Sequence, residues 1–335
     1  MSEAGIEKPN TDQMLAALKP FQRDTVEHVF RRMYTDPDCT RRFLVADEVG
    51  LGKTMVARGV IARAIEHLQD KVERVDIVYI CSNADIARQN LQRLNLTGSR
   101  EAAQVGRLTM LPAMLPQLDD RLNFVAFTPG TSFHMGNSTG KWQERALLYW
   151  MLEDLDLLPL SERGKVMGGG GPKLFQGGVN DLRDWKQRLR ARYLPGIGYV
   201  EIEPDLLRRF GDAIDREALQ ADSAGRSSLH DRIHEVCAAL KGVPTKNASD
   251  ELWRRMQRVV GELRRVLANA CLTALEPDLV ILDEFQRFKE LLDPENEAGE
   301  LAHRLFEFAE GDGGVRTQLL SATPYKMYTL HGEAE

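Results

Sequence analysis

Two spaced glycines followed by a lysine and a threonine stand near the start of the chain, in the segment A-D-E-V-G-L-G-K-T that ends at Thr54. Such glycines let backbone N–H groups converge on phosphate oxygens, the lysine supplies positive charge, and the threonine hydroxyl can complete the coordination of Mg²⁺. The segment therefore predicts a phosphate-binding loop for ATP and Mg²⁺, although an aspartate replaces the usual first glycine. The predicted cofactor-binding residues are Asp47, Glu48, Val49, Gly50, Leu51, Gly52, Lys53 and Thr54.

Two adjacent carboxylates close a second segment, the apolar run L-V-I-L-D-E-F-Q from Leu279 to Gln286. The run is typical of a buried strand, and its hydrophobic pattern gives no reason for the two acids. We expect Asp283 to hold Mg²⁺. Glu284 would point to the other side of an extended chain end and orient or deprotonate an attacking water. With Lys53, these two acids are the predicted catalytic residues.

A third segment is a short strand, Gln318 to Leu320, that runs into Ser321, Ala322, Thr323 and Pro324. In chain order the three segments are a phosphate loop, an acidic strand end and S-A-T. In this order and wording they resemble the ATP-binding domain of superfamily 2 helicases and translocases, especially the Swi/Snf-type, RapA-like branch. In that family, an aspartate at the first loop position is usual.

The resemblance implies further roles. D-E-F-Q matches the family's motif II, where Swi/Snf members more often carry D-E-A-H, so Gln286 stands where a histidine couples nucleotide to nucleic acid. Ser321, Ala322 and Thr323 match motif III, which links the ATP state to strand movement. L-K-P-F-Q-R-D-T-V-E resembles the adenine-reading motif, with Gln22 at the base.

Nucleic-acid contacts are implied at two more places. Cys81, Ser82 and Asn83 follow a strand and precede the helical stretch 84–94, as in motif Ia, and Ser82 or Asn83 can cap this helix. F-V-A-F-T-P-G-T-S-F resembles motif Ib. Its candidate contacts to the nucleic-acid backbone are Thr128, Gly130, Thr131 and Ser132.

Helical and strand patterns alternate in the first 133 residues, which predicts an α/β fold: a RecA-like domain with a parallel sheet flanked by helices. Residues 134–276 interrupt it as a mainly helical insertion, and 277–335 would complete it. The glycines at 168–171 with Pro172, and those at 177 and 178, predict turns. The predicted helices of the insertion are Lys141–Asp156, Asn180–Tyr193, Pro204–Ala221, Ser228–Leu240 and Asp250–Leu275.

Two groups of basic residues in the insertion suit a nucleic-acid backbone, but solvated helix faces are an equal alternative. His230 and His234 stand one helical turn apart, and we interpret them as surface histidines because no third zinc ligand is marked. The first basic group surrounds Trp185 and contains Arg183, Lys186, Arg188, Arg190 and Arg192. The second lies near Trp253 and contains Arg254, Arg255, Arg258, Arg264 and Arg265.

Composition agrees with a globular intracellular enzyme. The net charge of -6 argues against coating of DNA by the whole surface, and 43% hydrophobic residues allow a substantial core. Four separated cysteines indicate reduced thiols, and no apolar run approaches a membrane span, so a cytoplasmic protein is expected.

The predicted function is that of an ATP-binding motor domain that acts on nucleic acid. Double-stranded DNA is the expected partner. In the resembled family a second RecA-like domain supplies arginine fingers, and we expect this chain, which ends soon after Pro324, to lack it. The alternative is a nucleotide-gated module whose insertion binds a protein partner.

Overall fold

The computed structural model describes residues 10–47, 50–94, 103–104, 107–117, 121–133, 138–159, 170–243, 247–293, 295–306 and 314–321. The chain divides into two compact units. The sheet unit comprises residues 1–106, 118–133 and 275–335, and the helical unit comprises 107–117 and 134–274. The sequence-based boundaries placed residues 107–117 in the sheet unit, whereas the structure places them in the helical unit. There the Thr109 hydroxyl donates to the Glu144 carboxylate (2.6 Å).

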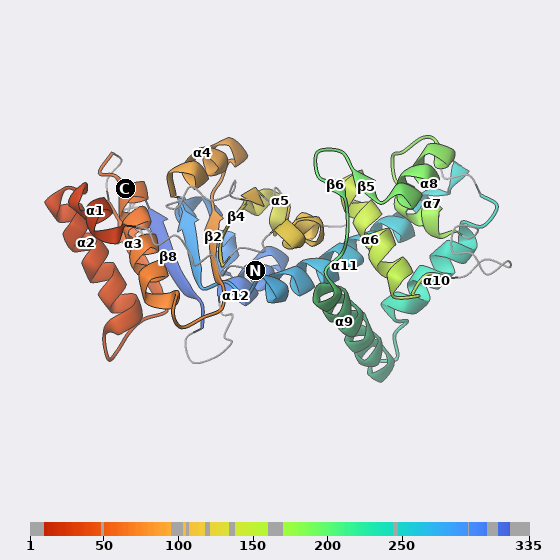
Figure 1. Ribbon diagram of the computed structural model, residues 1–335. Coiled ribbons are helices and arrows are strands. Elements are labelled where there is room, and N and C mark those ends of the chain that lie inside the picture. Colours follow the sequence, from red (N-terminus) through yellow and green to blue (C-terminus); the bar gives the residue numbers. More distant parts are fainter. Residues whose placement is uncertain are drawn as a thin grey trace, which may run out of the picture. The chain divides into compact units, whose positions relative to one another are not determined.

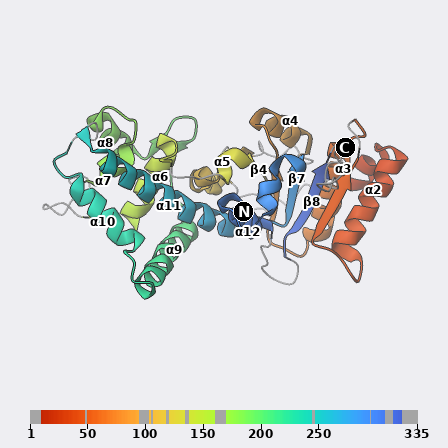
Figure 2. The ribbon, with the colours of Figure 1, turned by 180° about the vertical axis from the view of Figure 1, so that it is seen from behind.

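A six-stranded sheet forms the centre of the sheet unit (Figure 1, and from behind in Figure 2). Its strands follow the order β1-β8-β7-β2-β4-β3, and every neighbouring pair is parallel. The strands are β1 (Arg42–Ala46), β2 (Val75–Ile80), β3 (Ala103–Gln104), β4 (Leu122–Phe127), β7 (Leu279–Asp283) and β8 (Arg316–Ser321). All residues of β2 and β4 are buried, as expected for parallel strands covered on both faces. The predicted α/β class is confirmed.

Helices flank this sheet. Those of the sheet unit are α1 (Thr11–Ala16), α2 (Pro20–Phe30) with the π-helical turn η1 (Arg31–Thr35), α3 (Lys53–Leu68), α4 (Ala84–Leu94), α5 (Pro129–Ser132), η6 (Phe285–Leu292) and α12 (Glu297–Phe306). One core cluster joins α1 to α4 with one face of the sheet, and includes Val26, Ile61, Tyr79, Ile281 and Leu320. This packing fixes the ends of the central strands, where the candidate site lies.

The helical unit contains all five helices predicted for the insertion. They are α6 (Trp142–Asp154), α8 (Leu182–Ala191), α9 (Pro204–Ser223), α10 (Leu229–Ala239) and α11 (Asp250–Leu275), to which the structure adds α7 (Gly171–Gln176), η2 (Leu108–Ala113), η3 (Leu115–Gln117) and a hairpin of β5 (Tyr193–Leu194) and β6 (Gly198–Tyr199). The prediction of a turn at Gly171 and Pro172 was wrong, because both open α7. A Cβ on the preceding Gly170 would lie 1.9 Å from the Cys237 carbonyl, so glycine there permits close packing.

A buried ion pair holds the helical unit together. Glu144 on α6 and Arg264 on α11 are 0% and 1% exposed, and Arg264 Nε and Nη2 donate to Glu144 Oε1 at 3.0 and 2.9 Å. The Lys141 N–H donates to Oε2 (2.6 Å), and the Arg107 guanidinium lies 3.2 Å from the same oxygen. Each charge is therefore compensated where water is absent.

The four cysteines are free thiols, as predicted. Among the helices that the structure describes, none has the length and apolar character needed to cross a membrane.

Candidate nucleotide site at the carboxyl edge of the sheet

The carboxyl ends of β1, β8 and β7 meet at one edge of the sheet. Ala46 at the end of β1 pairs with Ser321, and Asp283 at the end of β7 pairs with Leu320. The Asp47 N–H also donates to the Ser321 carbonyl (3.3 Å). One strand thus separates the glycine loop, residues 47–52, from Asp283, which corresponds to about 10 Å across two strand spacings. The sheet brings the two predicted phosphate and Mg²⁺ segments together.

The glycine loop has the backbone conformation that its sequence requires. Gly50 and Gly52 have φ of 91° and 85°, in the left-handed region that favours glycine. Gly52 precedes α3, and its carbonyl accepts hydrogen bonds from the amides of Met55 (2.8 Å) and Val56 (3.1 Å). These bonds mark the start of α3 at the end of the glycine loop, where the helix dipole favours an anion. Glu48 and Val49 lie outside the described residues.

The positive charge and the hydroxyl of the loop lie where α3 begins. Lys53 Nζ donates to the Asp47 carbonyl (2.9 Å), so its ammonium lies over the loop backbone. Thr54 is half-buried on the same first turn. A Cβ at Gly50 would have no heavy atom within 4 Å, so the loop is open at this point. An anion-binding loop, a hydroxyl and a carboxylate suit Mg²⁺ and a phosphate chain.

Gln22 lies directly against the glycine loop. Its side chain is 7% exposed, Nε2 donates to the Leu51 carbonyl (2.8 Å), and Oε1 accepts from the Lys19 N–H (3.1 Å). A Cβ at Gly52 would lie 2.4 Å from Gln22 Nε2, so a side chain there would displace the Gln22 amide from the loop. The amide connects α2 to the loop backbone, and its contact with adenine stays a prediction.

Glu284 does not continue the strand, contrary to the sequence-based expectation of an extended chain end. Its φ is 52°, a conformation that is uncommon for residues other than glycine and that costs free energy. The turn directs the chain into η6, and Glu284 Oε2 pairs with Arg287 Nε at 2.8 Å. Gln286 follows with its Oε1 buried and without a hydrogen-bond partner among the described residues. The Glu284 side chain is 37% exposed, so its carboxylate is accessible to water.

Two polar residues that the sequence reading missed surround Asp283. The Tyr79 hydroxyl on β2 donates to Asp283 Oδ2 (2.5 Å), and Asn90 Nδ2 on α4 donates to the Tyr79 oxygen (2.7 Å). Burial, together with the charge of Asp283 and the hydrogen bond to it, raises the pKa of Tyr79 far above its usual value, so the phenol stays protonated. The only sequence signal was a tyrosine within an otherwise apolar stretch of strand.

The start of α4 has the predicted cap. Asn83 Oδ1 accepts hydrogen bonds from the amides of Asp85 (2.7 Å) and Ile86 (3.4 Å), while Ser82 is half-buried and makes no such cap. The Cys81 thiol donates to the Asn83 carbonyl (3.2 Å), and burial raises its pKa. The helix terminus is therefore well defined.

The segment after β4 offers fewer contacts than the sequence predicted. Thr128 is half-buried and Gly130 is exposed, but Ser132 has no exposed surface, so its hydroxyl cannot reach a nucleic-acid backbone. Ser321 at the end of β8 is 2% exposed. The side chain of Thr131, and all of Ala322 and Thr323, lie outside the described residues.

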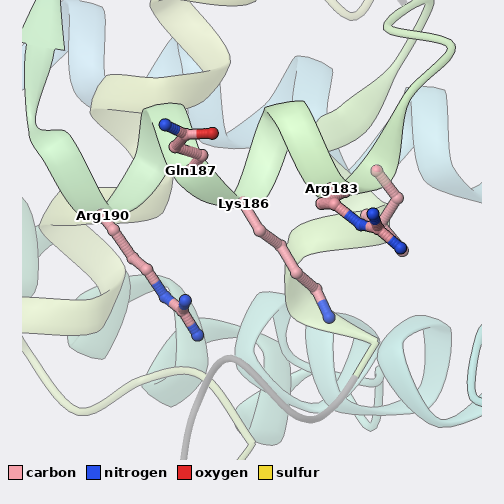
Figure 3. A pocket seen from close by; sticks show the side chains of 5 residues that line it. Arg183, Lys186, Gln187 and Arg190 are labelled. Atoms are coloured by element: carbon pink, nitrogen blue, oxygen red, sulfur yellow. The ribbon is translucent and has the colours of Figure 1, made fainter.

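In the helical unit, three cations line a surface pocket on α8 (Figure 3). The pocket has a volume of about 550 Å³ and is lined by Leu182, Arg183, Lys186, Gln187 and Arg190. Lys186 and Arg190 extend from α8 to the same side. Within the described ranges, no carboxylate lies within 4 Å of these three cations. We call Arg183, Lys186 and Arg190 the α8 basic face.

Four of the other predicted basic residues form ion pairs. Arg188 binds Asp184 (2.8 Å) and lies over the Trp142 ring, and Arg192 pairs with Glu153 and Asp154. In the second group, Arg255 pairs with Glu235, and Arg264 is buried against Glu144, so the expectation of a surface contact was wrong for Arg264. The rings of His230 and His234 lie 4.4 Å apart, and no third ligand-type residue joins them among the described residues.

Comparison of the chain with protein-family models, curated proteins and solved structures gave no match. The functional argument therefore depends on the site itself.

Proposed function

We propose that the sheet unit is the RecA-like ATP-binding domain of a nucleic-acid-dependent ATPase of the helicase and translocase class. The observation that carries this proposal is the position of the glycine loop and Asp283 at the same edge of a parallel sheet, one strand apart. In open α/β sheets, ligands bind outside the carboxyl ends of the strands. The acidic pair at the end of β7 and the loop before α3 meet this rule together.

In this proposal each residue has a separate task. The α3 amides and Lys53 bind the phosphates, Thr54 and Asp283 hold Mg²⁺, and Glu284 orients the attacking water and accepts its proton. When bound, Mg²⁺ neutralises charge that develops on the phosphate oxygens. Gln22 holds the loop through the Leu51 carbonyl and so connects α2 to the phosphate site.

Replacing Lys53 with alanine should weaken Mg-ATP binding about 10- to 100-fold, because a charged hydrogen bond to the ligand contributes about 1.5–3 kcal/mol. Isothermal titration calorimetry of the wild-type chain and the variant measures this change. Lys71→Ala is the matched control, since Lys71 is exposed in the same unit and contacts His67. Equal affinities for the Lys53 variant and the wild type would reject the proposed phosphate site.

The α8 basic face is the proposed contact with duplex DNA. We expect the triple variant R183E/K186E/R190E to weaken DNA binding and to reduce the slope of log K against log salt by about 3, one per lost phosphate contact. Fluorescence anisotropy across a salt series measures both quantities.

The control for this experiment reverses three exposed arginines elsewhere in the helical unit, Arg208, Arg216 and Arg226. It changes the net charge by the same amount. A control that weakens DNA binding as much as the α8 triple variant would show that net charge, and not this face, determines affinity.

A further inference from the structure

The hydrogen-bonded chain from Asn90 through Tyr79 to Asp283 joins three elements of the sheet unit. Asn90 lies on α4, Tyr79 on β2 and Asp283 at the end of β7. Tyr79 and Asn90 are 1% and 7% exposed, so no bulk water competes for these bonds. Tyr79 pairs with Ile281 in the sheet, and Asp283, two residues further along β7, faces the same side.

The direction of this chain is fixed by chemistry. The asparagine amide can only donate through Nδ2, so the Tyr79 oxygen accepts there and its single proton goes to Asp283 Oδ2. Oδ2 is thereby held in place, and among the residues that the structure describes no group hydrogen-bonds the second oxygen of Asp283, which can therefore meet a ligand.

We propose that Tyr79 is a positioning residue that orients Asp283 for Mg²⁺, and that Asn90 on α4 supports it by holding the Tyr79 oxygen. This inference deepens the proposed function and rests on it. Partners that hydrogen-bond a metal ligand fix its orientation, and their loss typically lowers metal affinity 10- to 100-fold. A buried tyrosine that only filled the core would not affect a cation.

The test is the Mg²⁺ dependence of ATP binding, followed with a fluorescent ATP analogue. We expect Tyr79→Phe, which removes only the hydroxyl, to raise the Mg²⁺ concentration for half-maximal binding about 10- to 100-fold, with affinity in EDTA unchanged. Asn90→Leu should raise it by a smaller factor, because the phenol still reaches Asp283. Tyr149→Phe is the control: it removes a buried hydroxyl that contacts Glu153 in the helical unit.

Three results separate the possibilities. If Tyr79→Phe has the Mg²⁺ dependence of the wild type while Lys53→Ala still loses ATP affinity, the positioning role is rejected and the phosphate site stands. If Lys53→Ala binds ATP as the wild type does, the proposed function itself fails. Thermal unfolding of each variant identifies loss of folding. If Tyr79→Phe does not fold, Asn90→Leu is measured in its place: a raised Mg²⁺ concentration for half-maximal ATP binding supports the positioning role, and an unchanged one rejects it.

Discussion

Replacing Glu284 with glutamine is expected to lower ATP turnover by about 100- to 10,000-fold, the usual contribution of a general base. The amide has the size of the carboxylate but cannot accept the proton of the attacking water. The affinity for Mg-ATP should stay close to that of the wild type, because Asp283 and the glycine loop are unchanged. Single-turnover phosphate release in the presence of duplex DNA, with calorimetry on the same samples, separates the two quantities.

The control for this result is Glu300→Gln, which removes an exposed carboxylate that pairs with Arg304 on α12. It should hydrolyse ATP at the wild-type rate. Undiminished turnover in Glu284→Gln would show that Glu284 is not the base, whereas a parallel loss of ATP affinity would indicate a role in binding.

The second large effect concerns the helical unit. We expect Arg264→Met to lower the free energy of unfolding of this unit by about 3–5 kcal/mol, since the substitution leaves the buried Glu144 without its main counter-charge. Burial alone would raise the pKa of Glu144, but Arg264 and the hydrogen bonds from Thr109 and Lys141 hold it below its usual value. The stabilisation is therefore present at neutral pH and is lost as pH falls through the lowered pKa.

Urea unfolding at pH 7 measures the decrease in the free energy of unfolding caused by Arg264→Met. Arg258→Met, an exposed position on the same helix, is the control and should change stability by less than about 0.5 kcal/mol. The double variant Glu144→Leu with Arg264→Met should recover much of the loss, because it removes both charges. A cost below about 1 kcal/mol in Arg264→Met would contradict the structural role of the ion pair.

Local pattern was sufficient for much of the fold. The apolar runs at β2 and β7 and the periodic segment of α11 identify elements because burial on both faces, or on one helical stripe, leaves a direct trace in residue order. The start of α7 was missed because glycines near Pro172 look like a turn. The long-range approach of Gly170 to the Cys237 carbonyl, which residue order does not reveal, explains one of these glycines.

The candidate site was predictable to a similar degree. Sequence order placed the glycine loop and Asp283 at strand ends, and the parallel sheet brings such ends to one edge. Tyr79 and Asn90 were not predictable, because a tyrosine in an apolar strand looks like core and its partners lie on other elements. The left-handed conformation of Glu284 was missed because residue type gives no sign of it.

The central claim is that Lys53 and Asp283 act on one Mg-nucleotide ligand, and a double-mutant cycle tests it most directly. Calorimetry gives Mg-ATP affinities for the wild type, Lys53→Ala, Asp283→Asn and the double variant. We expect both single variants to bind more weakly and their effects to be non-additive by about 0.5–3 kcal/mol, as for residues that share a ligand. Strictly additive effects, or a wild-type affinity in either single variant, would contradict a common pocket.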